Sequence, residues 1–145
     1  REVERAIRFL RPLCAIFIDI DHFKDFNDRY SHAVGDQVLI TVAKTLKQGV
    51  REVDLVGRYG GEELIILLVE TTLSSAQEVA NRLRLEVERT VTATAYGNLG
   101  VTVSMGVSQF RPDQPTLDTL IHRADRAMYQ AKLAGRNCVM TNAGE

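Results

Sequence analysis

The sequence has only two cysteines, three prolines and no tryptophan among its 145 residues. A secreted scaffold of this size often carries more cysteines, and Cys14 and Cys138 form neither a Cys-x-x-Cys motif nor a Cys/His cluster for zinc. We therefore interpret both as reduced thiols of a cytoplasmic protein. No apolar run approaches the ~20 residues of a membrane span, and no signal peptide is recognisable.

An excess of charge of either sign is also lacking, because the formal net charge is only -1. This value gives no support to wholesale binding of nucleic acid or a membrane, so any phosphate ligand must be bound by a few local cations. An apolar share of 45% is typical of a globular chain, and the length suits one domain over 1–145. Because the chain begins REVERAIRFL, without a methionine, we expect it to be part of a longer protein that could be anchored to a membrane.

Hydrophobic periodicity predicts strands that alternate with helices. The expected strands are 13–20, the two arms of a hairpin around the Gly-Gly of RYGGEEL, 101–110 and 137–141. The expected helices are 1–10, 32–50, one that begins with the capping box Ser75-x-x-Glu78, and one after Pro115 that ends at Gly135. This order predicts an α/β (α+β) fold, with one sheet flanked by helices and antiparallel pairing at least at the hairpin.

The stretch IDIDHFKDFND places Asp19 at the end of a buried apolar strand. A carboxylate there is costly unless a cation or hydrogen-bond donors satisfy it, and strand ends are where α/β sheets commonly bind ligands. The simpler alternative, a strand end followed by a polar helix with Asp21 as its N-cap, is about as well supported by this stretch alone.

In RYGGEEL the glycines permit a tight turn, and Glu62 and Glu63 follow it. The two side chains point to opposite faces of the strand, so at most one easily joins Asp19. If the hairpin pairs with the first strand, Asp19 and Glu62 lie side by side and offer oxygen ligands to Mg²⁺. An ordinary hairpin with solvated acids is the alternative.

Two further clusters carry cations. In AKLAGRN, Lys132 and Arg136 are suited to phosphates, although the helix dipole alone favours cations at a helix C-terminus. Arg51 and Asp54 precede the hairpin, where a charged connection is the simpler interpretation of their spacing.

The motifs IDIDHFKDFND, VGD, RYGGEEL, VTVSMGVS and ADRAMYQAKLAGRN occur in this order. In this combination the chain, from about residue 12 to 140, closely resembles the GGDEF family of diguanylate cyclases. The resemblance implies an enzyme that converts two GTP into cyclic di-GMP and two pyrophosphates. It also implies a fold similar to the ferredoxin-like palm of nucleotidyl cyclases, with a mostly antiparallel sheet and GGEEL on a β-hairpin turn.

The resemblance implies roles for individual residues. Mg²⁺ or Mn²⁺ would be bound by Asp19, the backbone carbonyl of Ile20, Glu62 and, close by, Glu63. The triphosphate would be held by backbone N–H groups around His22 and Phe23 and by the side chains of Lys24, Lys132 and Arg136. The expected catalytic residues are Glu62 and Lys24.

Asn27 and Asp36 would recognise the guanine edge. Guanine offers donors at N1 and N2 that suit a carboxylate, whereas an amide both donates and accepts. Adenine lacks this donor pair, so Asp36 is expected to discriminate against ATP by leaving a charge unpaired.

The resemblance also implies partners. Each domain would hold one GTP, so turnover requires a homodimer whose sites face each other. Arg51 and Asp54 match the family's RxxD site, where cyclic di-GMP binds as an inhibitor with help from an arginine on the next helix. Arg82 or Arg84 would supply that arginine.

Three features depart from the family pattern. Leu64 replaces Phe in the turn motif, Ser31 stands where Gly is usual, and the N-terminal segment resembling DxLTGLxNR is missing. A regulatory domain upstream is expected. The rival functions are a catalytically silent receptor for GTP or cyclic di-GMP, and a cyclase or polymerase of other specificity. We favour the enzyme because both acids of the turn are kept.

Overall fold

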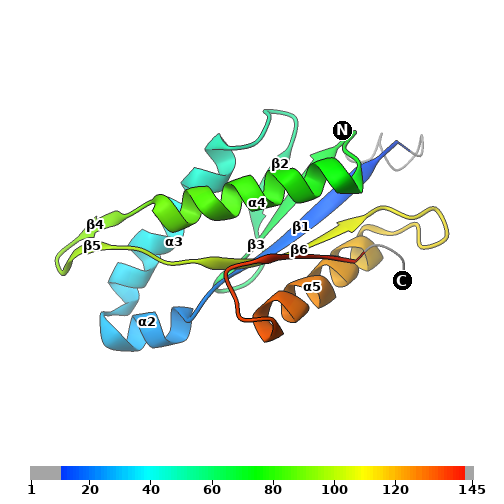
Figure 1. Cartoon of the computed structure of the whole chain (residues 1–145). Helices are drawn as coiled ribbons and strands as arrows, with labels where there is room; N and C mark the ends of the chain where they lie inside the picture. Colours follow the sequence, from blue (N-terminus) through cyan, green and yellow to red (C-terminus); the bar gives the residue numbers. More distant parts are fainter. Residues whose placement is uncertain (1–10, 143–145) are drawn as a thin grey trace.

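The computed structural model describes residues 11–142, and the helix predicted over 1–10 lies outside them. Five strands form one sheet in the spatial order β2 (Leu55–Arg58), β3 (Glu63–Val69), β1 (Leu13–Ile20), β6 (Val103–Gln109) and β7 (Val139–Asn142). Neighbouring strands are antiparallel except β6 and β7, which are parallel. The predicted α+β architecture, with the hairpin arm β3 paired to the first strand, is confirmed (Figure 1).

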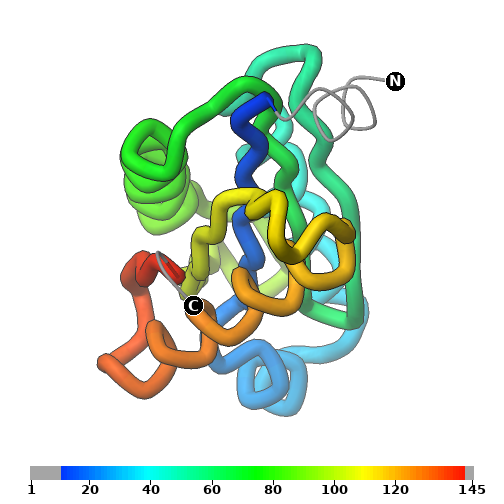
Figure 2. Tube along the Cα trace, turned by 90° about the vertical axis from the view of Figure 1, so that its right-hand side faces the viewer, coloured from blue at the N-terminus to red at the C-terminus, as the bar shows by residue number. Residues whose placement is uncertain are grey.

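Helices cover both faces of this sheet, because alternate side chains of β1 point to opposite sides. Ile16, Ile18 and Ile20 belong to a core shared with α3 (His32–Gln48) and α4 (Leu73–Arg89). Ala15 and Phe17 pack in a second core with α5 (Leu117–Leu133). Fully burying a large aliphatic or aromatic side chain stabilises the fold by roughly 1.5–3 kcal/mol. The strand that ends at Asp19 is therefore fixed from both faces, and Figure 2 shows it running through the middle of the molecule.

Gly106 in β6 sets how closely α5 approaches the sheet. A Cβ atom at this position would lie 2.1 Å from the carbonyl oxygen of Ala124 and 2.1 Å from the backbone nitrogen of Met128. Both are backbone atoms of α5 and have little freedom to move. The glycine of VSMGVS therefore allows α5 to lie directly on β6, with Lys132 near the end of the helix.

Several predictions of local structure were wrong or incomplete. Helix α4 begins at Leu73 with Thr72 as its N-cap, which accepts a hydrogen bond from the backbone nitrogen of Ser75, so the proposed capping box is not used. The short helix α2 (Phe23–Arg29) and the hairpin of β4 (Thr92–Thr94) and β5 (Gly97–Leu99) had no clear periodic signal. A helix of seven residues makes only about two turns, and strands of three residues show little alternation, so neither gives a clear period. Within residues 11–142, no helix is long and apolar enough to span a membrane.

Candidate active site and a second cavity

The carboxylates of the GGEE turn lie beside the end of β1. In the antiparallel register Asp19 is opposite Glu63, and the backbone nitrogen of Ile20 donates to the carbonyl oxygen of Glu62 at 3.2 Å. Residues directly opposite in such a pair project to the same face of the sheet. The structure thus brings Asp19, Ile20, Glu62 and Glu63 to one edge of the sheet. The residue opposite Asp19 is Glu63, whereas Glu62 was expected beside it from the sequence.

Local contacts fix this turn, and one of its two glycines makes room for a neighbouring side chain. The Arg58 side chain donates to the carbonyl oxygens of Gly60 (3.1 Å) and Gly61 (2.8 Å), and these hydrogen bonds fix the backbone of the turn. A Cβ atom on Gly60 would lie 2.5 Å from the Glu63 carboxylate. Gly60 therefore leaves room for the side chain of Glu63 to lie over the turn.

Asp19 is held in an environment that resists ionisation. The pKa of Asp19 is raised from 3.8 to about 6, mainly by burial and also by the charges of Glu62 and Glu63, while Lys132 acts in the opposite direction. The Lys132 ammonium lies 3.4 Å from Asp19 and 3.2 Å from Asp21. Burial also raises the pKa of Glu63. The site therefore has more negative charge than one lysine compensates.

Asp21 is a residue whose role the sequence did not reveal. It is 4% exposed, and its carboxylate accepts hydrogen bonds from Ser104 (2.6 Å), Thr102 (2.7 Å), Lys132 (3.2 Å) and the backbone nitrogen of Asn137 (3.1 Å). Burial would raise its pKa, but these hydrogen bonds hold the pKa below the usual range. The proposal that Asp21 caps α2 is wrong, since His22 occupies the N-cap position. The sequence offered one indication of this position: residues two apart in an extended segment point to the same side, so Asp21 is expected on the same side as Asp19.

These residues fit a hard divalent cation. The donors are oxygens, and the raised pKa of Asp19 shows that added positive charge would be favourable there. Among residues 11–142, no group of three or more His, Cys, Asp or Glu side chains is already arranged to hold an ion. Protein ligands from one or two carboxylates, completed by water and phosphate oxygens, are the usual pattern for Mg²⁺.

The two residues predicted to bind guanine lie on α2 and α3. A Cβ atom on Gly35 would be 1.7 Å from Asn27 Oδ1, so Gly35 provides the space that this side chain occupies. Asn27 Oδ1 is buried and has no hydrogen-bond partner within the described residues. Asp36 is exposed and lines a cavity of about 430 Å³, whose apolar wall includes Leu39 and Leu64.

The residues predicted to bind phosphate lie at two chain segments next to this cluster. His22, Phe23 and Lys24 form the start of α2, directly after Asp21, and His22 has a left-handed φ of 57°. Lys132 lies in the last turn of α5, and Arg136 follows the helix with a φ of 66°. Both segments meet at the Asp21 carboxylate through Lys132 and the turn that carries Arg136.

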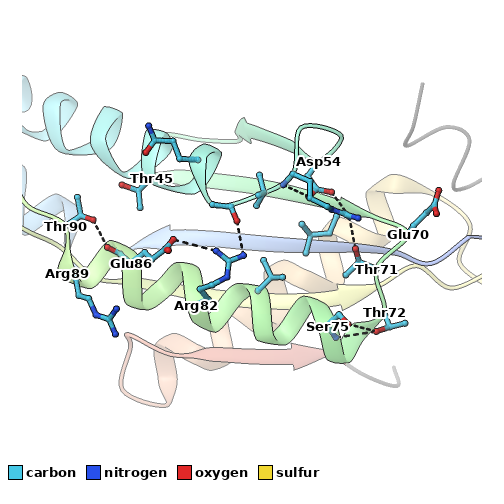
Figure 3. Close-up of a pocket in the computed structure, with 16 residues that line it drawn as sticks. Thr45, Asp54, Glu70, Thr71, Thr72, Ser75, Arg82, Glu86, Arg89 and Thr90 are labelled. Carbon is cyan, nitrogen blue, oxygen red and sulfur yellow. Dashed lines mark hydrogen bonds and ion pairs between the residues drawn. The ribbon is translucent and has the colours of Figure 1, made fainter.

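A larger cavity of about 1080 Å³ lies on the α3–α4 side and contains Arg51, Asp54 and Arg82 (Figure 3). Arg82 points from α4 across the cavity and donates to the carbonyl oxygen of Gly49 at 2.9 Å. Arg84 does not line this cavity, because it bonds Asn81 and Asn137 instead. The geometry therefore brings Arg82, not Arg84, toward Arg51.

Asp54 in this cavity is almost fully engaged by the protein itself. Its side chain is 2% exposed, and its oxygens accept from the backbone nitrogen, Nε and Nη2 of Arg51 and from the backbone nitrogen of Val69. A carboxylate has about four acceptor positions. Asp54 thus joins the start of β2 to the end of β3 and fixes Arg51, while more than half of the Arg51 side chain stays exposed.

Comparison with known proteins decides the family. Residues 1–138 match the sequence profile of the diguanylate cyclase GGDEF domain. The chain belongs to the GGDEF family. This GGDEF domain is 42% identical over 143 residues to the response regulator PleD of Caulobacter vibrioides, covering 97% of the chain and 32% of PleD. It is 44% identical over 127 residues to diguanylate cyclase A of Treponema denticola, covering 88% of the chain and 34% of that protein.

The GGDEF domain therefore spans about a third of the length of these relatives.

Solved structures confirm the fold. The active GGEEF domain of a diguanylate cyclase from Vibrio cholerae superposes with a TM-score of 0.89 at 33% identity, covering 99% of this chain and 91% of that one. The GGDEF domain of DgcB from Caulobacter crescentus, in complex with c-di-GMP, gives a TM-score of 0.88 at 31% identity, covering 97% and 84%.

Proposed function

We propose that this domain is an active diguanylate cyclase, which condenses two GTP into cyclic di-GMP and two pyrophosphates. The observation that carries the proposal is the carboxylate cluster at the end of β1, where burial raises the pKa of Asp19 to about 6 beside Glu62 and Glu63. A divalent ion bound there with the nucleotide would offset the cost of this arrangement. Relatives named diguanylate cyclases support the same reaction.

Asp19, the Ile20 carbonyl and Glu62 would hold Mg²⁺ or Mn²⁺, with Glu63 close by, and the ion would lower the pKa of a ribose 3′-OH and neutralise charge at the α-phosphate. The protein's own part is to fix these oxygens. Strand β1 is buried on both faces, and Arg58 fixes the turn that carries the glutamates. Positioning of this kind contributes strongly to catalysis because little reorganisation is left to the reaction.

The cations around the cluster would orient the triphosphate. Lys132 and Arg136 would hold its far end, while Lys24 and the backbone N–H groups of His22 and Phe23 would hold the near end. Lys132 is already oriented by Asp21, and it would exchange its contact with Asp19 for a phosphate oxygen. Charge-assisted contacts of this type are stronger than neutral hydrogen bonds.

Asn27 and Asp36 would select guanine. The side-chain oxygen of Asn27, which has no hydrogen-bond partner among residues 11–142, supports this assignment, because a buried acceptor without a donor is costly and gains from a ligand donor. The test is a nucleotide screen with Mg²⁺, comparing GTP with ATP at equal concentrations. Conversion of GTP alone is expected, and equal conversion of ATP would contradict the assignment of Asp36.

Catalysis would require two copies of the domain, because each holds one GTP and the attacking hydroxyl must come from the other. We also propose a regulatory domain upstream and a cytoplasmic location, where GTP is available. PleD supports the proposal of a further domain, because the match covers only 32% of its length.

Cyclic di-GMP would bind and inhibit at the second cavity. Arg51 is exposed and fixed by Asp54, so its guanidinium can stack on guanine and donate to its acceptor edge. Arg82 would complete the site from α4. The alternative function, a silent receptor, is supported by the same cavity, and it predicts binding of cyclic di-GMP or GTP without turnover.

A further inference from the structure

The turn after α5 adopts an unusual backbone conformation. Gly135, Arg136 and Asn137 have consecutive φ angles of 119°, 66° and 48°. Gly135 at the helix end is explained by the C-terminal cap, in which the backbone nitrogen of Arg136 donates to the carbonyl oxygen of Ala131 at 3.0 Å. Arg136 and Asn137 are not glycines, and such residues hold left-handed conformations only where their surroundings fix them.

The side chain of Asn137 provides contacts that fix this turn to α4. Its Oδ1 accepts from Arg84 Nη1 at 2.9 Å, and its Nδ2 donates to Glu88 Oε2 at 2.9 Å. Arg84 is held in turn by Asn81 and is only 15% exposed. An amide both donates and accepts, so it matches an arginine and a glutamate at once. Asparagine also tolerates the left-handed conformation better than most residues.

The backbone of Asn137 connects the same turn to the active site. Its nitrogen donates to Asp21 Oδ2 at 3.1 Å, while Lys132 donates to Asp21 Oδ1 at 3.2 Å. The side chain of Arg136, between them in the turn, is exposed and makes no hydrogen bond or ion pair with residues 11–142. The backbone of Arg136 is thus fixed on both sides, and its guanidinium, which has no partner within the described part of the chain, can bind a ligand.

We propose that Asn137 is a positioning residue for the terminal phosphates of the nucleotide. By joining α4 to Asp21, it holds the turn that presents Arg136 and keeps Asp21 in place to orient Lys132. This inference rests on the proposed function, because it assumes that the nucleotide is GTP bound at the β1 cluster. It predicts that Asn137 affects binding of the β- and γ-phosphates and leaves recognition of guanosine unchanged.

The test compares two ligands by calorimetry in Mg²⁺: 3′-deoxy-GTP, which lacks the attacking hydroxyl, and guanosine 5′-monophosphate, which lacks the terminal phosphates. Asn137→Gly keeps the left-handed backbone accessible and removes the amide. We expect it to weaken 3′-deoxy-GTP binding about tenfold and to change monophosphate binding less than twofold. Asn98→Gly, at an exposed asparagine in β5, is the matched control and is expected to change neither.

A rescue variant separates positioning from general stability. Asn137→Asp keeps an acceptor for Arg84 but places a carboxylate against Glu88, so it is expected to weaken 3′-deoxy-GTP as well. Adding Glu88→Gln exchanges donor and acceptor between the two positions and is expected to restore at least half of the lost affinity.

Several outcomes would overturn the inference. Equal weakening of both ligands in Asn137→Gly would indicate a purely structural role, and so would a lower melting temperature with unchanged affinities. Failure of the double variant to recover affinity would show that the contact with Glu88 is irrelevant. If the wild-type domain binds neither ligand, both the proposed function and this inference fail. If the wild-type domain binds 3′-deoxy-GTP tightly and Asn137→Gly binds it equally well, only the inference on Asn137 fails.

Discussion

Asp19→Asn is predicted to make the ligand-free domain more stable at pH 8 while it removes the proposed metal site. Burial raises the pKa of Asp19 from 3.8 to about 6, and the carboxylates of Glu62 and Glu63 contribute in the same direction. At pH 8 the folded chain must nevertheless carry this carboxylate in its ionised form. Asparagine has nearly the same shape and no charge, so the cost of ionisation disappears.

The magnitude follows from the size of the pKa shift. A shift of roughly 2 pKa units corresponds to about 3 kcal/mol in the free energy of unfolding. The ion pair with Lys132, 3.4 Å away, lowers the pKa of Asp19 and is already included in this shift. We therefore expect a stabilisation of about 1–3 kcal/mol, and a rise in melting temperature of roughly 3–10 °C for a domain of this size.

The pH dependence gives the prediction its sign. Because the folded pKa of Asp19 is raised, the wild-type stability linked to this group is fully present below about pH 4 and is lost as the pH rises through about 6. The advantage of Asp19→Asn should therefore be absent near pH 4 and complete above about pH 7. Urea unfolding followed by circular dichroism at pH 4, 5, 6 and 8 measures it.

Asp28→Asn, which removes an exposed carboxylate on α2, is the control and should show no such trend. Two results would refute the reasoning. The first is an Asp19→Asn variant that is less stable than wild type at pH 8. The second is a gain of the same size at pH 4 and pH 8, which would show that the effect does not come from ionisation.

Three further predictions concern activity. Glu62→Ala should abolish cyclic di-GMP synthesis and leave the far-ultraviolet circular dichroism unchanged; wild-type turnover would show that the site is misassigned. Gly35→Ala should displace Asn27, because the new Cβ would lie 1.7 Å from Asn27 Oδ1. The KM for GTP should rise about tenfold while the domain stays folded. An unchanged KM would exclude Asn27 from guanine binding. Arg51→Ala should weaken inhibition by cyclic di-GMP at least tenfold, whereas Arg84→Ala should not, and the reverse order would place the inhibitory site elsewhere.

The carboxylate cluster could be predicted from the sequence because its determinants are local. An unbroken apolar run fixes β1 as a buried strand that ends at Asp19, and the Gly-Gly pair fixes the hairpin. Pairing of β1 with β3 then brings Glu62 and Glu63 to the same edge. The strand and the turn depend on periodicity and turn chemistry, which act over a few residues. The pairing of β1 with β3 is a long-range contact, which could be stated from the sequence only as a condition.

The role of Asp21 could not be predicted, because its donors come from distant parts of the chain: Thr102, Ser104, Lys132 and Asn137. The sequence also could not decide whether Arg82 or Arg84 faces the second cavity. The two flank the buried Leu83 at about 100° on either side of the helix. Which of them faces the cavity depends on where α3 packs, and that is a property of the tertiary fold.

The most direct test of the proposed function measures products as the protein concentration is raised. The domain is incubated with GTP and Mg²⁺ over a hundredfold range of concentration, and cyclic di-GMP and pyrophosphate are separated by chromatography. The account predicts two pyrophosphates for each cyclic di-GMP, and a rate per molecule of protein that rises with concentration as two copies associate. GTP binding without product at every concentration, also in a longer dimeric form of the protein, would contradict it and identify a silent receptor.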